Sequence, residues 1–225
     1  MFESKYSKLL TILLIVGIVL IVGILSVAGF LIIRNGKLKE EAGSAVDHFQ
    51  GQVNETPEEN VQENNVITNE VAPIIGVENI VINGNTSDET NTSNYKGFPM
   101  VGTMEIPAIN LKYPILETAS KSAIEVALAI YDGVGLNQVG NTTIVGHNYR
   151  NGTFFSNNKK LVEGDKVYIT DTTGKKITYI IYKIYTTSPE DSSYLDRDTE
   201  GRREITLLTC TDDTQSRLVI WAKQQ

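Results

Sequence analysis

The lone cysteine of this chain, Cys210, ends one apolar run and precedes an arginine, Arg217, that begins the next. The first run is Glu204-Ile-Thr-Leu-Leu-Thr-Cys and the second is Arg-Leu-Val-Ile-Trp-Ala. If the two runs form an antiparallel hairpin, both residues flank its loop at one end of a sheet. The guanidinium would then favour a cysteine thiolate and could stabilise an oxyanion. Considered alone, Cys210 fits a buried structural cysteine at least as well.

A histidine, His147, stands in a comparable position after the run Thr-Thr-Ile-Val-Gly. At a strand end, after a glycine that permits close backbone approach, it could reach a nucleophile on a neighbouring strand, although a lone histidine also fits a structural role. The other histidine, His48, lies in an acidic segment and is expected to be solvated. Cysteine catalysis needs a thiolate, a proton donor for a leaving amine and donors to the oxyanion. Cys210, His147 and Arg217 together form a sufficient minimal set.

Composition excludes several classes of function. The chain has 225 residues and a formal charge of −7, which argues against nucleic-acid binding, because that binding depends on Lys and Arg neutralising phosphates. One cysteine and two histidines cannot form a cysteine-rich zinc site or an internal disulfide framework. No metal ion or cofactor is therefore expected.

Four segments follow one another along the chain. Residues 1–8 form a short N-terminus, and residues 9–33 are 25 residues without a charge, long enough for a transmembrane helix. Residues 34–96 are expected to form a flexible linker, since residues 40–95 hold 11 acidic residues and no Lys or Arg. Residues 97–225 have the length of a common folded domain.

The orientation of the apolar segment is not decided by its flanking charges. Lys5 and Lys8 precede it and three further basic residues follow it closely. A cleaved signal peptide is the competing interpretation, although its apolar core is usually shorter. The short N-terminus suits a cytoplasmic location, with the body of the chain exported. Within the linker, Val71–Ile82 could form a short strand or dock on the domain.

The folded domain has mostly the pattern of short strands separated by turn residues. This pattern predicts a mainly β fold, a closed or nearly closed β-barrel. Only Lys121–Tyr131 is expected to be helical, because its apolar residues fall on one face. The expected strands are Gly102–Ile106, Thr142–Val145, Lys166–Thr170, Lys176–Tyr185, Glu204–Cys210 and Leu218–Ala222.

Four stretches of the domain resemble the sortase family. Thr206-Leu-Leu-Thr-Cys210 is similar to the TLxTC signature of sortases, and the run from Arg217 is similar to their RLVV-type strand. Gly140-Asn-Thr-Thr-Ile-Val-Gly-His147-Asn resembles the strand that leads to the sortase histidine, and Gly102 to Ile115 resembles the opening strands. The order and spacing of these motifs extend the resemblance over residues 97–225.

The resemblance implies a closed eight-stranded sortase β-barrel with one or two short helices, in a cysteine transpeptidase on the outer face of a Gram-positive-type bacterium. It implies that Cys210 attacks the Thr-Gly bond of an LPxTG-like sorting signal and forms a thioacyl-enzyme. His147 would protonate the leaving amine and then deprotonate an amine of peptidoglycan or its precursor. Arg217 would stabilise the oxyanion, and Thr209 would line the substrate site. The protein would be a single-pass membrane protein with an extracellular catalytic domain.

The subclass is expected to be a surface-protein-anchoring or specialised sortase. The sequence lacks the Asp-Pro-aromatic lid and the second membrane span of pilin-polymerising class C enzymes, and Thr186–Arg203 is short for the helical insertion of class B. Trp221 is expected to pack in the core. The carboxylates available for a class A calcium site are expected to be solvated turn residues: Glu105, Glu163, Asp165, Glu190 and Asp191.

Two alternatives remain at this point. The first is a cysteine hydrolase in which water replaces the acceptor amine, and an assay with added amine distinguishes it. The second is a non-catalytic β-domain on a stalk that binds cell-wall polymer or a partner protein. This second alternative requires Cys210 to be unreactive toward thiol reagents.

Overall fold

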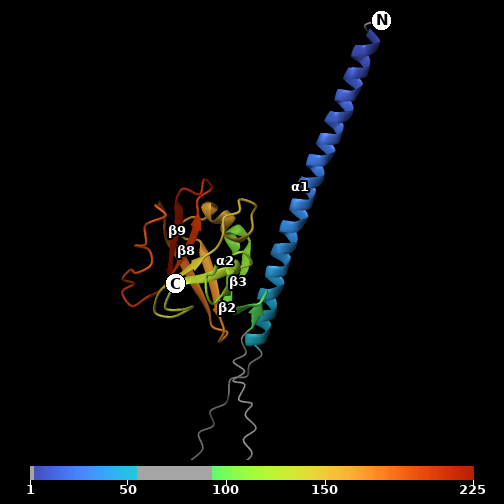
Figure 1. Ribbon diagram of the computed structural model, residues 1–225. Coiled ribbons are helices and arrows are strands. Elements are labelled where there is room, and N and C mark those ends of the chain that lie inside the picture. The colour runs from blue at the N-terminus through green and yellow to red at the C-terminus, as the bar shows by residue number, and fades with distance from the viewer. Residues whose placement is uncertain (1–2, 55–92) are drawn as a thin grey trace, which may run out of the picture.

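The structure, a computed structural model, describes residues 3–54 and 93–225. Figure 1 shows a long helix, α1, and a barrel that lies against the C-terminal half of this helix. The segment Val71–Ile82, expected to form a strand or to dock on the domain, lies outside the described residues.

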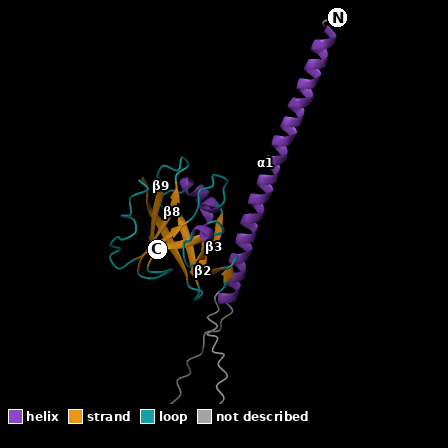
Figure 2. Ribbon diagram, viewed as in Figure 1, coloured by secondary structure: helices purple, strands orange, loops and turns teal. Residues whose placement is uncertain are grey.

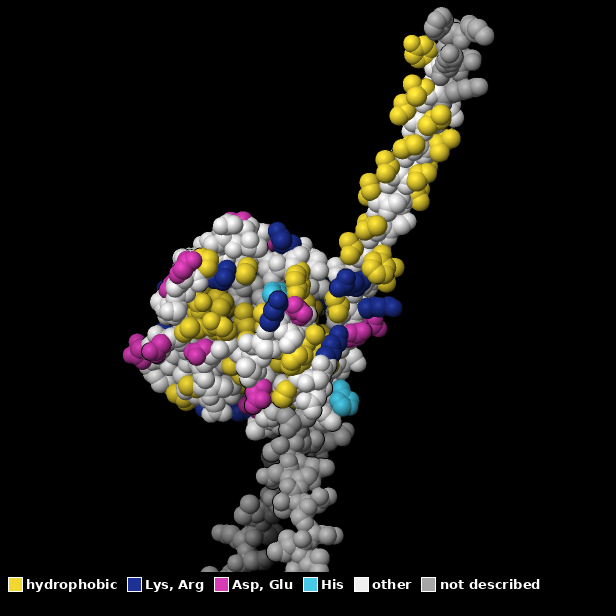
Figure 3. All heavy atoms as spheres, viewed as in Figure 1, with side chains coloured by type: hydrophobic (Ala, Val, Ile, Leu, Met, Phe, Trp, Pro, Cys, Tyr) yellow, Lys and Arg dark blue, Asp and Glu magenta, His cyan; other side chains and the backbone are white. Residues whose placement is uncertain are grey.

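Helix α1 spans Glu3–Asn54 and contains the whole apolar run. Within the described residues it is the one helix long and apolar enough to cross a membrane. Its first half exposes hydrophobic side chains and lacks neighbours, whereas charged side chains cluster beside the barrel (Figure 3). The apolar run is therefore a candidate membrane anchor. The helix does not end at Ile33, and residues 34–54, which we expected in a flexible linker, are helical.

The C-terminal part of α1 is packed against the barrel. Ala42, Val46 and Phe49 are buried, and their spacing of four and three residues places them on one helix face. Phe49 belongs to a hydrophobic cluster that includes Met100 and Leu116 of the barrel. This apolar face stabilises the docked helix, although the surrounding acidic composition had suggested a solvated segment.

Polar contacts flank the apolar face of α1. Gln50 Nε2 donates hydrogen bonds to Glu105 Oε1 at 2.8 Å and to Thr103 Oγ1 at 3.2 Å. Glu41 and Asp47, two of the acidic residues in the expected linker, pair with barrel lysines. Both ion pairs are partly exposed, so they fix the register of docking more than they add stability. The pairs are Glu41 with Lys96 and Asp47 with Lys112.

Replacing Phe49 by Ala tests whether α1 is part of the folded domain. The side chain is only 2% exposed, and its loss leaves a cavity that should cost about 3–5 kcal/mol. We expect the unfolding temperature of the full chain in detergent to fall by roughly 10 °C, measured by the fluorescence of Trp221. Phe30→Ala, on the exposed apolar part of the same helix, is the matched control and should cause no change. Equal effects of both substitutions would contradict a docked helix.

The described residues form an eight-stranded barrel with one further two-residue strand, β1. The sheet order is β1-β2-β3-β4-β5-β8-β9-β7-β6, and pairing of β2 with β6 closes the barrel. Most neighbours are antiparallel, whereas β3 with β4 and β5 with β8 are parallel. Figure 2 shows that helices are few outside α1. The strands are β1 (Asn94–Tyr95), β2 (Phe98–Ile106), β3 (Leu111–Leu116), β4 (Leu128–Gly133), β5 (Gly140–Val145), β6 (Lys166–Asp171), β7 (Lys176–Thr187), β8 (Arg203–Cys210) and β9 (Arg217–Gln224).

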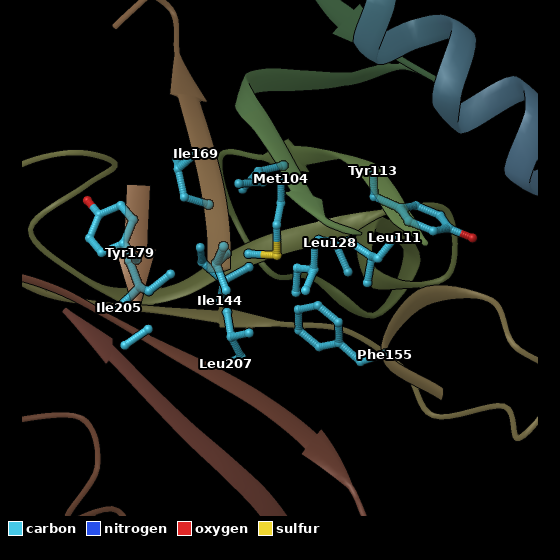
Figure 4. Packing of buried hydrophobic residues seen from close by; sticks show 14 of the residues in the cluster. Met104, Leu111, Tyr113, Leu128, Ile144, Phe155, Ile169, Tyr179, Ile205 and Leu207 are labelled. Carbon is cyan, nitrogen blue, oxygen red and sulfur yellow. The ribbon is translucent and has the colours of Figure 1, made fainter. Parts of the chain in front are cut away.

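The interior of the barrel is filled by apolar side chains from all around the sheet. Met104, Ile144, Ile169 and Leu207 are completely buried and point toward one another (Figure 4). Phe155, from the short 3₁₀ segment Phe154–Lys160, closes one end of this core. Because buried apolar side chains occupy the interior among the described residues, the ends of the strands are the better place for a polar site.

The expected helix over Lys121–Tyr131 is wrong beyond its first turn. The helix α2 covers Lys121–Ile124, with the Ser120 hydroxyl accepting a hydrogen bond from the Ala123 N–H at its start. The chain then enters β4, because residues from Leu128 onward pair with β3 and β5. A consecutive apolar run fits a strand buried on both faces as well as a helix. A second short 3₁₀ segment, Pro107–Ile109, joins β2 to β3.

Candidate active site

Two parallel strands, β5 and β8, bring His147 and Cys210 to the same end of the barrel. Their register places Val145 opposite Leu208. His147 follows Val145 by two residues, and Cys210 follows Leu208 by two residues. Because neighbouring parallel strands advance equally per residue, His147 and Cys210 lie at the same end of the sheet, where both line one pocket.

Arg217 reaches this end of the sheet through the hairpin of β8 and β9. The two strands pair in antiparallel register, with Cys210 directly opposite Arg217. Hydrogen bonds close the loop between them, from the Thr211 N–H to the Ser216 carbonyl at 3.0 Å and back from the Ser216 N–H to the Thr211 hydroxyl at 3.1 Å. The hairpin expected from the two apolar runs is confirmed.

Side-chain hydrogen bonds hold the ends of β5 and β8 together. The Thr209 hydroxyl donates to the Gly146 carbonyl at 2.7 Å, and Asn148 Nδ2 donates to the Cys210 carbonyl at 3.0 Å. Gly146 is required here, since an added Cβ would lie 2.6 Å from Leu128 Cδ2. The buried Thr209 side chain therefore holds the backbone at Gly146, the residue before His147, in place.

A pocket of about 260 Å³ surrounds these residues. Cys210, His147 and Arg217 line it together with Thr209, and each of the first three is half-buried. Half-burial leaves the thiol accessible while removing part of its water. The other side chains around the pocket are mainly apolar or aromatic: Ile124, Tyr131, Val145, Pro189, Tyr194 and Leu208.

Burial lowers the pKa of His147, and the carboxylate of Glu125 partly offsets this effect. The imidazole ring of His147 lies 4.8 Å from the ring of Tyr149, centroid to centroid. The backbone carbonyl of His147 accepts a hydrogen bond from the Phe155 N–H. The neutral imidazole is thus favoured near neutral pH, a form that can accept a proton from a thiol or an amine.

Residues 104–225 match the family model of the sortase domain. The chain belongs to the sortase family. Transpeptidation is the general activity of this family, and the closed eight-stranded barrel that the resemblance implied is confirmed as the sortase fold. The catalytic roles expected for the site residues stay predictions.

Two curated sortases resemble the chain over its barrel. Sortase A of Bacillus anthracis is 27% identical over 125 residues, which cover 54% of this chain and 58% of that protein. Sortase A of Streptococcus agalactiae is 27% identical over 132 residues, which cover 56% of this chain and 53% of that protein. The similarity thus spans little more than half the length of either relative.

Solved sortase structures also superpose on the barrel. A lid mutant of Sortase A from Corynebacterium diphtheriae has a TM-score of 0.52 and 29% identity, covering 57% of this chain and 71% of that one. A Clostridium perfringens Sortase D5 transpeptidase has a TM-score of 0.52 and 28% identity, covering 56% and 79%. A pilus-related Sortase C of group B Streptococcus has a TM-score of 0.52 and 29% identity, covering 56% and 67%. Sortases of several subclasses are similar, so the expected exclusion of the pilin-polymerising class stays a prediction.

A buried polar cluster that no sequence pattern indicated lies behind one wall of the pocket of this sortase. Asn141 of β5 donates hydrogen bonds from Nδ2 to the carbonyls of Tyr194 and Leu195, at 3.1 and 3.0 Å. Its Oδ1 accepts from Arg197 Nη2 at 3.0 Å and from Thr206 Oγ1 at 2.9 Å. Asn141 thereby fastens the segment between β7 and β8, which supplies the pocket residue Tyr194.

Arg197 extends this cluster toward the outer face of the sheet. It forms a buried ion pair with Glu204 and lies 4.3 Å from the ring centre of Trp221. Burial raises the pKa of Tyr182 to about 12, and its hydrogen bond to Glu204 acts in the same direction. Burial alone would raise the pKa of Glu204, but hydrogen bonds from Tyr182 and Arg197 outweigh it and lower the pKa. Trp221 packs in this outer cluster, outside the barrel interior.

Substituting Asn141 by Ala should loosen the pocket wall without touching the thiol. We expect KM for a sorting peptide to rise about tenfold and stability to fall by about 1–3 kcal/mol, because carbonyls and a guanidinium lose their partner. Asn137→Ala is the matched control, since Asn137 is equally buried but bonds to Asp171 and Tyr179 away from the pocket. The labelling rate of Cys210 should stay constant. An equal rise in KM for both variants would reduce Asn141 to a general stabilising role.

The carboxylates considered for a calcium site are dispersed among other interactions. Glu105 accepts hydrogen bonds from Gln50 and Lys176 and is tied to α1. Asp191 accepts a hydrogen bond from the Thr187 hydroxyl at 2.5 Å. Among the described residues no three metal-binding side chains gather at one place.

Proposed function

We propose that this protein is a membrane-anchored cysteine transpeptidase that cleaves an LPxTG-like sorting signal and transfers the acyl group to an amine of peptidoglycan or its precursor. The observation that carries the proposal is the convergence of Cys210, His147 and Arg217 in one half-buried pocket at the end of β5, β8 and β9. Membership of the sortase family supports the proposal, because transpeptidation is the general activity of that family.

In the first half-reaction, the Cys210 sulfur attacks the carbonyl carbon of the scissile peptide bond, and its proton passes to His147. The Arg217 guanidinium, opposite Cys210, donates hydrogen bonds to the oxyanion and to the peptide. His147 returns the proton to the leaving amine as the carbon–nitrogen bond breaks. A thioester with Cys210 and a neutral imidazole remain.

In the second half-reaction, an acceptor amine attacks the thioester carbonyl. His147 takes a proton from the amine, and Arg217 again stabilises the oxyanion. The carbon–sulfur bond breaks and Cys210 leaves as a thiolate, which recovers a proton from His147. The net result is exchange of one amide bond for another, with no oxidant or cofactor consumed.

The anchor and the docked helix support a location at a membrane surface. The proposed topology has residues 1–8 in the cytoplasm, residues 9–33 across the membrane and the catalytic domain outside the cell. Sorting-signal proteins and cell-wall amines are the proposed partners. The proposed role is the anchoring of surface proteins, distinct from pilin polymerisation.

Mass spectrometry of the full chain in detergent tests this function. The protein is incubated with a panel of LPxTG-like peptides, with and without small amines. An acyl adduct on Cys210 and an amine-exchanged product are expected. An adduct that yields only hydrolysed product with every amine would instead indicate a cysteine hydrolase. Slow labelling of Cys210 by thiol reagents, together with no adduct, would favour a binding domain.

A further inference from the structure

A second pocket, the helix-side pocket, lies between α1 and the barrel. Its volume is about 580 Å³. Arg34 and Leu38 of α1 form one wall, and Glu125, Tyr149 and Phe154 of the barrel form the facing wall. The pocket exists because α1 is docked, since the barrel alone would leave this side open.

The helix-side pocket adjoins the catalytic pocket at two places. Ile124 lines the catalytic pocket, and the next residue, Glu125, lines the helix-side pocket. His147 lines the catalytic pocket, and its ring contacts Tyr149, which lines the helix-side pocket. A molecule held in the helix-side pocket against Tyr149 would therefore lie close to His147.

The two walls of the helix-side pocket carry opposite charges. Arg34 stands on the α1 wall and Glu125 on the barrel wall, and both are exposed. Neither forms an ion pair with another residue in the described parts of the chain. A ligand with an ammonium group near the barrel and an anionic group near the helix complements this arrangement.

The position of Arg34 indicates that the helix-side pocket lies at the level of the membrane surface. Arg34 directly follows the apolar run of residues 9–33, and Leu31 of that run also lines the pocket. Figure 3 shows the change from apolar to charged side chains on α1 beside the barrel. A molecule held at the membrane surface can therefore reach the pocket as readily as a soluble one.

We propose that the helix-side pocket binds the acceptor of the second half-reaction, and that this acceptor is a primary amine that also carries an anionic group. Glu125 faces its ammonium and Arg34 its anionic group. His147, neutral after the leaving amine has departed, takes one proton from the ammonium. The free amine then attacks the Cys210 thioester, and as the carbon–sulfur bond breaks its nitrogen loses a second proton to the departing Cys210 thiolate. This inference rests on the proposed transpeptidase function.

Partitioning of the acyl-enzyme between transfer and hydrolysis is the test. The full chain in detergent is incubated with a sorting peptide and one of two pairs of amines. The first pair compares glycylglycine, which has a carboxylate, with glycylglycine amide, which has none. The second pair compares phosphoethanolamine, which has a phosphate, with ethanolamine, which has none. The ratio of transferred to hydrolysed product does not depend on the rate of acylation, because both products form from the same acyl-enzyme. This ratio also depends little on the basicity of His147, because the same imidazole activates both water and the amine. The two pairs distinguish a carboxylate from a phosphate.

We expect the anionic member of at least one pair to be transferred about two- to fivefold better than its neutral partner, the size of a partly exposed ion pair. Arg34→Gln should abolish that preference, and Glu125→Gln should lower transfer to both members. The matched controls are Lys37→Gln on α1 and Glu117→Gln before α2, both exposed and outside the pocket.

Partitioning that is the same in the wild type, R34Q and E125Q would overturn the acceptor site while leaving the transpeptidase function intact. The same holds if the control variants change partitioning as much as R34Q and E125Q do. If no acyl adduct forms on Cys210, the proposed function fails first, and the acceptor site falls with it. The two failures are therefore distinguishable in one experiment.

Discussion

Cys210→Ala should abolish both peptide cleavage and amine transfer, with activity reduced by at least about 10⁴-fold. No other thiol exists in the chain, and the residue that replaces it carries no nucleophile. The measurement is the acyl adduct by mass spectrometry together with product formation over time. Both should disappear, because the oxyanion donor and the histidine have no covalent intermediate to act on.

Two controls separate loss of the nucleophile from loss of the fold. Cys210→Ser keeps the size of the side chain and should also fail to form an adduct, since a hydroxyl is a far weaker nucleophile at neutral pH. The half-buried position of Cys210 predicts that the unfolding temperature, followed by Trp221 fluorescence, stays nearly constant. Retained activity in Cys210→Ala would refute the assigned nucleophile.

Arg217→Lys should lower kcat/KM about 10²- to 10³-fold, the cost of losing one oxyanion donor. Lysine keeps the positive charge but lacks the planar fork of donors that can hold an oxyanion and a peptide carbonyl together. The loss should appear in the acylation rate measured in single turnovers. The pocket should remain formed, because the pairing of β8 with β9 uses backbone groups.

Arg203→Lys is the matched control for this substitution. Arg203 begins β8 at the end opposite Cys210, where it donates a hydrogen bond to the Asn137 carbonyl at 2.9 Å. We expect a small change in stability and an unchanged acylation rate. If Arg217→Lys acylates as fast as Arg203→Lys does, Arg217 contributes only charge, and the oxyanion must be stabilised by other donors.

Local patterns accounted for most strands of the barrel. The strands at residues 166–171, 176–187, 203–210 and 217–224 were anticipated within a few residues, because each is a β-branched and aromatic run bounded by turn residues. The strand at 111–116 was covered only by the resemblance to the opening strands of sortases, and most of the strand at 128–133 was expected to be helical. The strand at 128–133 follows directly on the short helix α2, and its apolar residues fit a helix as well as a strand, so only its pairing with the strands at 111–116 and 140–145 decides its conformation.

The docked half of α1 was missed for a related reason. Its composition is acidic and polar, which resembles a solvated segment when its neighbours are unknown. Only three of its residues are fully buried, and the charged partner of Asp47, Lys112, lies 65 residues away in the chain. The pocket that we assign to the acceptor follows from this docking.

By itself the sequence determined the apolar run that is a candidate membrane anchor, the β-rich domain and the three residues on which the chemistry is proposed to depend, since residue type and short-range periodicity carry that information. The tertiary structure alone decided that β5 and β8 run in parallel with His147 beside Cys210, that Asn141 fastens the pocket wall 53 residues away, and that α1 encloses a second pocket. These features depend on which distant segments bury one another, and burial is a property of the whole chain rather than of any local run.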